Sequence, residues 1–175
     1  MQRRVLIFGA STVGKTSICK EITRLRPKLD YISASSILHR LRHDYPRTCR
    51  FNQSEMQFHL CAAIARVCDT RPDIDFLIDG HLYMAKSSAI VPKAAIKRLR
   101  PTMLLRVHVS PALISERRRA LGRPRYSLQE CMKDIENEEH AGEVLSKALQ
   151  VPLETISPPL VSSVEDILYR LPPEI

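Results

Sequence analysis

The sequence predicts an α/β fold in which a parallel sheet carries helices on both faces. Short, uninterrupted apolar runs alternate along the chain with longer segments whose apolar residues recur every three or four positions. Uninterrupted apolar runs are typical of strands buried on both faces of a parallel sheet, and the longer spacing is typical of helices. The alternation therefore predicts strands joined by helical crossovers. The length of 175 residues fits a single domain, residues 1–175.

The predicted elements follow one another in a regular order. The strands are expected at the apolar runs, which are residues 5–8, 29–33, 76–78, 103–109 and 153–156. The helices are expected between them, because serine or asparagine can cap a helix start and proline stops its continuation. They should run from Thr16 to Pro27, from Ser35 or Ser36 to Pro46, from Asn52 or Ser54 through Cys68, from Ser127 to about Leu149, and from Ser162 or Ser163 through Leu171.

The composition excludes several classes of protein. Five cysteines, an odd number without CxxC spacing, predict a reduced protein of the cytoplasm, or of the nucleus if the source is eukaryotic. No apolar stretch approaches the ~20 residues that span a bilayer, so we expect no membrane partner. The apolar run behind the basic N-terminal residues is too short for a secretory signal.

The charge favours anionic ligands. The chain has 27 basic and 19 acidic residues, a formal net charge of +8, and most of the basic residues are arginines. Arginine grips phosphate groups through paired hydrogen bonds. Basic residues are concentrated in residues 97–125, but aromatic residues make up only 5% of the chain and tryptophan is absent. Because stacking platforms are scarce, we do not expect nucleic acid to be the main substrate.

The most specific motif is GASTVGKT at residues 9–16, which fits GxxxxGK(S/T) between a predicted strand and a predicted helix. In such a loop the backbone N–H groups and the helix N-terminus hold phosphate groups, the lysine reaches the outer phosphates and the hydroxyl binds Mg²⁺. These roles fall to Lys15 and Thr16. We expect ATP to contact Gly9, Ser11, Thr12, Val13, Gly14, Lys15, Thr16 and Ser17.

A second feature lies where the third predicted strand ends, in Asp79-Gly80-His81. Open α/β sheets bind ligands at the carboxyl ends of their strands. Asp79 is therefore predicted to act on Mg²⁺ or to orient a nucleophile. An ordinary turn aspartate is the alternative. For His81, a loop histidine and a role beside the substrate stay equally open.

These residues carry a resemblance. The loop at residues 9–16, the Asp-x-His strand end and the arginine-rich segment 117–125 followed by a glutamate-rich helix are similar to the P-loop nucleoside monophosphate kinases. Among them the chain most resembles the archaeal-type adenylate kinases and the related nuclear adenylate kinase/ATPases. The resemblance implies a P-loop NTPase fold with a five-stranded parallel sheet of order 2-3-1-4-5, ATP and Mg²⁺ as cofactors, and phosphoryl transfer to a nucleoside monophosphate, with AMP favoured.

The resemblance also implies acceptor-binding helices within residues 34–68. The acceptor phosphate would need a cationic clamp, and Arg50 is the first choice, with Arg40 and Arg47 behind it. Each of these can equally be a surface charge. The acceptor-binding residues we expect are Ser33, Ser35, Arg40, Arg50, Gln57 and His81. Ala34-Ser35-Ser36 departs from the Gly-Asp that such kinases typically carry there.

A short arginine-rich lid is expected at about residues 117–127. Arginines brought over the phosphates stabilise the charge that spreads over the transferred group. We expect Arg119 and Arg123 to act in catalysis, and Arg117 and Arg125 to bind the nucleotide. A basic helix end that complements the helix dipole is the alternative. The glutamates at positions 136, 138, 139 and 143 are predicted to form a solvated helix face.

Two other functions stay open from the sequence. The first is a nucleotide-switched ATPase whose basic segment docks on RNA or a ribosomal partner. The second is a kinase of a small metabolite, which would keep the same ATP site and change only the acceptor pocket. The unusual segment at residues 33–36 favours this second alternative.

Overall fold

The computed structural model describes residues 2–26, 28–44, 51–85, 87–123 and 126–157. Arg47, Arg50, Arg125 and the helix expected at residues 162–171 lie outside them. The elements, in chain order, are β1 (Arg4–Phe8), α1 (Lys15–Leu25), β2 (Leu29–Ser33), α2 (Ala34–Asp44), α3 (Gln53–Asp69), β3 (Asp75–Asp79), β4 (Tyr83–Met84), β5 (Ala89–Ile90), α4 (Lys93–Leu99), β6 (Met103–Val107), α5 (Pro111–Ala120), α6 (Leu128–Leu149) and β7 (Leu153–Ile156).

The main sheet has five parallel strands in the order β2-β3-β1-β6-β7. Since β6 and β7 are the fourth and fifth strands of this sheet, the predicted order 2-3-1-4-5 is confirmed. Ile7 of β1 pairs with Asp79 of β3, so the carboxyl ends of these two strands lie side by side. The antiparallel pair β4 and β5 was not predicted, because two residues per strand are too few to show a pattern.

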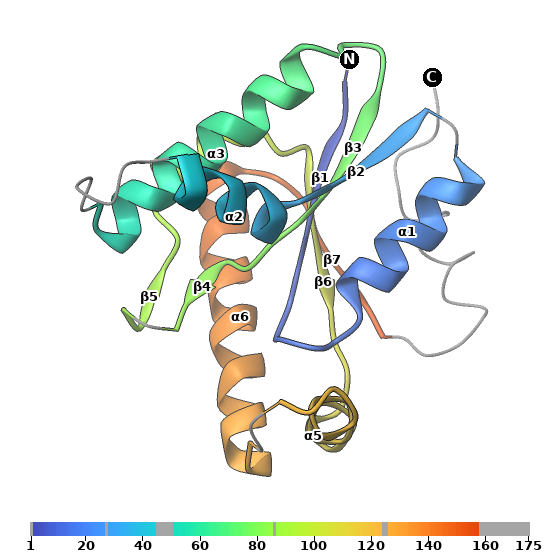
Figure 1. The fold of residues 1–175 in the computed structure, drawn as a ribbon, viewed down its shortest axis with the longest axis vertical. Coiled ribbons are helices and arrows are strands. Elements are labelled where there is room, and N and C mark those ends of the chain that lie inside the picture. The colour runs from blue at the N-terminus through green and yellow to red at the C-terminus, as the bar shows by residue number, and fades with distance from the viewer. Residues whose placement is uncertain (1, 27, 45–50, 86, 124–125, 158–175) are drawn as a thin grey trace.

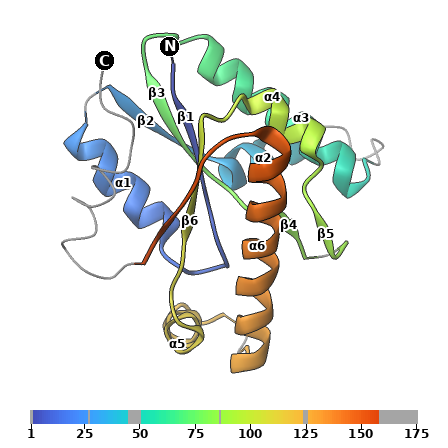
Figure 2. The ribbon, with the colours of Figure 1, turned by 180° about the vertical axis from the view of Figure 1, so that it is seen from behind.

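Helices cover both faces of the sheet, and this explains the uninterrupted apolar strands. Leu6 and Phe8 of β1 point into a core shared with α3, α4 and α6, whereas Val5 and Ile7 point into a core shared with α1 and α5. Figures 1 and 2 show α1 on one side of the sheet and α3 and α6 on the other. Because successive residues of a strand face opposite ways, both must be apolar.

Polar caps set several helix starts. Asn52 and Ser127 each cap a helix through a reciprocal capping box, as predicted for α3 and α6. At α2 the predicted cap was two or three residues too late: the Ser33 side chain, rather than Ser35 or Ser36, accepts a hydrogen bond from the Ser36 N–H, 3.3 Å. The short α4 was missed. Among the described residues no helix combines the length and apolar composition needed to cross a membrane.

A close approach of α6 to the sheet depends on Gly142. A Cβ atom at this position would lie 2.3 Å from Cζ of Phe8, a side chain that is itself fully buried. Real Cβ atoms essentially never approach so closely, and the phenyl ring cannot move within a packed core. Gly142 therefore fixes how near α6 lies to β1.

We predict that Gly142→Ala destabilises the protein by about 1–3 kcal/mol, because the added methyl group overpacks the core beside Phe8. The free energy of unfolding, from urea titration followed by circular dichroism, checks this. Glu143→Ala, at the next and exposed position of α6, is the control and should change stability by less than about 0.5 kcal/mol. Equal midpoints for Gly142→Ala and the unmodified chain would contradict the prediction.

Candidate functional site

A cavity of about 830 Å³ opens at the carboxyl edge of the sheet. One side of it is formed by residues 11–18, which are the loop after β1 and the start of α1. The rest of the lining includes residues of α2, α3 and the end of β3, together with Arg117 and Ala120 of α5 and Leu121 and Arg123 just after that helix. The predicted phosphate-binding loop and the predicted acceptor region therefore face one common space.

The backbone of the loop has the conformation that its glycines allow. Gly9, Thr12 and Gly14 have positive φ angles of 145°, 70° and 102°. A Cβ atom at Gly9 would lie 2.5 Å from the carbonyl oxygen of Val107, so no other residue fits there. Helix α1 then begins at Lys15, and the N–H groups of its first turn have no partner within the helix. The segment thus has the form of an anion-binding nest at a helix N-terminus.

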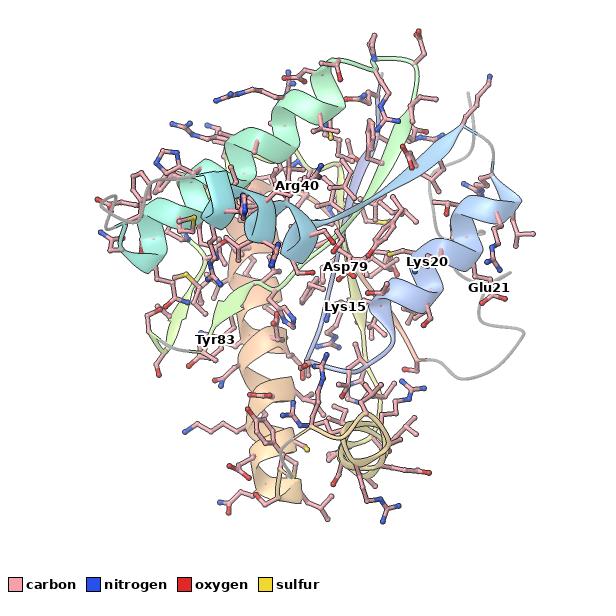
Figure 3. All side chains as sticks on the ribbon, viewed as in Figure 1. Lys15, Lys20, Glu21, Arg40, Asp79 and Tyr83 are labelled. Atoms are coloured by element: carbon pink, nitrogen blue, oxygen red, sulfur yellow. The ribbon has the colours of Figure 1, made fainter. Side chains whose placement is uncertain are left out.

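Lys15 is buried inside this loop. Its Nζ donates hydrogen bonds to the carbonyl oxygens of Gly9, 2.7 Å, and Ala10, 3.1 Å. Burial lowers the pKa of the Lys15 amine, and the nearby Asp79 carboxylate opposes that shift. Figure 3 shows Lys15 and Asp79 close to the start of α1. The predicted phosphate-binding cation is therefore held at the loop within reach of an anion.

Asp79, the last residue of β3, is hydrogen-bonded to the phosphate-binding loop through Thr16. Its Oδ2 accepts hydrogen bonds from the Thr16 hydroxyl, 2.8 Å, and from the Tyr31 hydroxyl, 3.2 Å. A carboxylate and a hydroxyl side by side at a phosphate-binding loop are the oxygen ligands that Mg²⁺ takes together with phosphate oxygens and water. Thr16 and Asp79 thus fit the predicted metal site. Burial raises the pKa of Tyr31, which keeps its hydroxyl protonated and able to donate to Asp79.

His81 has a buried carboxylate partner. Its Nδ1 lies 2.6 Å from Oε1 of Glu138 on α6, and Oε2 of Glu138 accepts a hydrogen bond from the Leu82 N–H, 2.9 Å. The Nδ1 atom of His81 therefore faces this carboxyl group, and the other ring nitrogen, Nε2, is not part of that contact. The His81 side chain is half exposed and lines the cavity. Its imidazole ring is therefore available to a molecule bound in the cavity.

The prediction of a solvated glutamate face was wrong for Glu138. Only 4% of this residue is exposed. Cys131 and Leu145, which lie seven positions before and after it on α6, are both buried. Its place in the apolar stripe of the helix was the signal that sequence reasoning missed. Glu139 is also paired, through an ion pair with Arg106.

The structure brings two of the predicted lid arginines to the phosphate-binding loop. Arg117 Nη1 donates to the carbonyl oxygen of Val13, 2.6 Å, and Arg123 Nη1 donates to Oγ of Ser11, 3.2 Å. Both arginines line the cavity, whereas Arg119 is exposed and does not. The neighbouring Arg118 is buried, and its guanidinium lies 3.6 Å from the centre of the Tyr126 ring.

The predicted acceptor residues divide into two groups. Ser35 and Gln57 line the cavity beside His81. Ser33 does not line it but lies 2.9 Å from Ser35, hydroxyl to hydroxyl. Arg40 is exposed on α2 and the structure does not bring it to the cavity. Arg50, the first choice for the phosphate clamp, and Arg125 lie outside the described residues, so their roles stay predictions.

Sequence reasoning missed Tyr31 as well as Glu138. Tyr31 lies two residues before Ser33 on the edge strand β2, so both side chains point to the same side of the sheet. Its contact with Asp79 depends on the pairing of β2 with β3, where Ser33 lies opposite Asp79. The residues around Tyr31 in the sequence therefore do not indicate that its hydroxyl contacts Asp79.

Comparisons with known proteins agree with this geometry. No curated protein matches the sequence. Among solved structures, a gluconokinase from Sinorhizobium meliloti 1021 has 15% identity and a TM-score of 0.58, with 95% of this chain and 90% of that chain covered. A sugar kinase from Janibacter sp. HTCC2649, solved without ligand, has 16% identity and a TM-score of 0.61, with 98% and 95% covered. At such identities these structures show the fold alone.

The predicted P-loop NTPase fold is confirmed, and the prediction of a nucleotide-dependent phosphotransferase is supported. The comparisons do not support the narrower resemblance to adenylate kinases. A family model described as "AAA domain" matches residues 8–136, which include the phosphate-binding loop, Asp79, His81 and the arginines of α5. Because this match covers well over half of the chain, the chain belongs to the AAA domain family AAA_17.

Proposed function

We propose that the protein transfers the γ-phosphoryl group of ATP to a hydroxyl group of a small-molecule acceptor. The observation that carries this proposal is the His81–Glu138 pair, whose imidazole faces the same cavity as the phosphate-binding loop. A phosphate acceptor such as AMP attacks with an oxygen that is already anionic. A hydroxyl acceptor must lose a proton, so it gains from a base placed beside it.

The donor side of the cavity supplies charge. Lys15, Arg117 and Arg123 surround the loop and would bind the phosphate groups of ATP. Thr16 and Asp79 would hold Mg²⁺. When bound, the ion neutralises charge on the phosphate oxygens. The protein's own contribution on this side is to position the phosphates and stabilise the developing charge.

The acceptor side supplies the base. As the acceptor oxygen forms its bond to the γ-phosphorus, its proton passes to Nε2 of His81. The bond between the γ-phosphorus and the β,γ-bridging oxygen breaks, and ADP leaves with that electron pair. Glu138 stabilises the resulting imidazolium through Nδ1 and keeps the ring oriented. The phosphorylated acceptor and ADP are the products.

Two further observations favour a hydroxyl acceptor over AMP. Among the described residues, α2 and α3 contribute no arginine or lysine to the cavity lining. The two solved structures reported above are named as a gluconokinase and a sugar kinase. An AMP kinase would have to draw its phosphate clamp from residues outside the described part of the chain, such as Arg50 or Arg47. The experiments below distinguish the proposed function from an AMP kinase and from an ATPase that acts on a partner.

We predict that Lys15→Ala lowers the rate of phosphoryl transfer by at least about a hundredfold, because the cation beside the phosphates is lost. The measurement is ADP formation with Mg²⁺ and a saturating hydroxyl acceptor. Lys20→Ala, an exposed position on the same helix, is the control and should keep normal activity. Near-normal turnover in a folded Lys15→Ala variant would refute the phosphate-binding role of the loop.

We predict that His81→Gln and Glu138→Gln each lower kcat by about 10² to 10⁴ and leave the KM for ATP nearly unchanged. In Glu138→Gln the amide would donate to Nδ1 and so reverse the tautomer of His81. A fall in kcat with an unchanged KM for ATP, in a variant that stays folded, is a change that a purely structural role would not cause.

Glu143→Gln, exposed on the same helix, is the matched control for the Glu138 variant. The same assays separate the alternatives. Transfer to AMP but to no hydroxyl compound, with kcat insensitive to His81→Gln, would favour a nucleotide kinase. ATP hydrolysis that rises with RNA and ignores every acceptor would favour the ATPase.

A further inference from the structure

We infer that the acceptor is an uncharged hydroxyl compound with a flat, largely apolar body, and that a nucleoside is the class that fits. This inference rests on the proposed function, because it names the acceptor of that same site. It concerns the half of the cavity opposite the phosphate-binding loop, which the sequence left open between nucleotides and small metabolites.

The walls of this acceptor half are apolar. They are built from the side chains of α2, α3 and α4 that lie under the cavity, namely Leu38, Leu60, Cys61, Ile64, Ile96 and Leu99. All but Leu38 are buried, so they form a preformed floor. Burial raises the pKa of the Cys61 thiol to about 12, and the thiol therefore stays neutral. Such a floor binds apolar faces and gives no partner to hydroxyl groups.

Polar groups are few in this half of the cavity. Of the described lining residues there, Ser35, Gln57 and His81 are the ones with hydrogen-bonding side chains. A free sugar or sugar acid carries a hydroxyl on nearly every carbon, and most of these would be buried against leucine and isoleucine. Each polar group buried without a partner costs about 1–3 kcal/mol in proteins. This floor therefore rejects polyhydroxylated acceptors.

The residues that the structure describes fit charged acceptors no better. The carboxylate of a sugar acid or the phosphate of AMP would need a cation on the acceptor side. Among the described lining residues the cations are Lys15, Arg117 and Arg123, and all three contact the phosphate-binding loop. ATP would occupy them.

A nucleoside matches both the floor and the polar groups. Its base offers two flat apolar faces to the leucine and isoleucine side chains. The edge of the base carries donors and acceptors, and the Gln57 amide offers one of each in a plane. Its sugar carries a primary hydroxyl that could give its proton to His81.

A substrate panel tests the inference. Transfer from γ-labelled ATP with Mg²⁺ is measured to adenosine, guanosine, cytidine, uridine and their deoxy forms, and to ribose, glucose, gluconate and AMP. We expect at least one nucleoside to exceed every sugar and gluconate by about a hundredfold in kcat/KM. Preferred transfer to a sugar or to gluconate would overturn the inference and leave the proposed function standing. Transfer to none of the hydroxyl compounds would overturn both.

Two variants on α2 test whether the apolar side chains under the cavity cause the preference for a nucleoside. Leu38 lines the cavity and is half-buried, so Leu38→Asn should fold; we expect the KM for the best nucleoside to rise about tenfold with the KM for ATP unchanged. Leu41→Asn is the matched control, because Leu41 packs on the same core but does not line the cavity. Equal effects of the two variants on the nucleoside KM would contradict an apolar acceptor floor.

Discussion

The hydrogen bond from Thr16 to Asp79 is the contact on which the site depends. It forms because β1 and β3 are parallel neighbours in register, with Ile7 opposite Asp79. The loop after β1 and the carboxylate that ends β3 therefore emerge at the same edge of the sheet. That register in turn requires strands that are apolar on both faces and helices that cover both faces. The chemistry of the site is thus a consequence of how the core is packed.

Helix α6 links the core to the acceptor side. At Gly142 it lies against Phe8, close enough that a methyl group would clash. One turn earlier, the same approach brings Glu138 to His81 and to the Leu82 N–H. Burying a carboxylate is costly unless its oxygens are hydrogen-bonded, and here both are. A small residue and a buried charge on one helix face therefore belong to the same arrangement.

The cavity is chemically divided. Its donor half gathers Lys15, Arg117 and Arg123 around backbone groups of the loop, so it suits a highly charged nucleotide. Its acceptor half has an apolar floor of α2, α3 and α4 side chains. Under the proposed function, this division would separate the two substrates by charge, with the phosphates on one side and an uncharged acceptor on the other.

The sequence by itself determined the alternation of apolar strands with helices, the phosphate-binding loop and the carboxylate at the end of β3. Each of these features depends on residues that are close together in the sequence: apolar runs, the glycine spacing of the loop and the last residue of a strand. Only the tertiary structure decided that Glu138 holds His81, that Tyr31 contacts Asp79 and that Arg40 stays away from the cavity. The first two contacts join residues 57 and 48 positions apart. Such contacts depend on how helices and strands pack, which no local pattern of residues records.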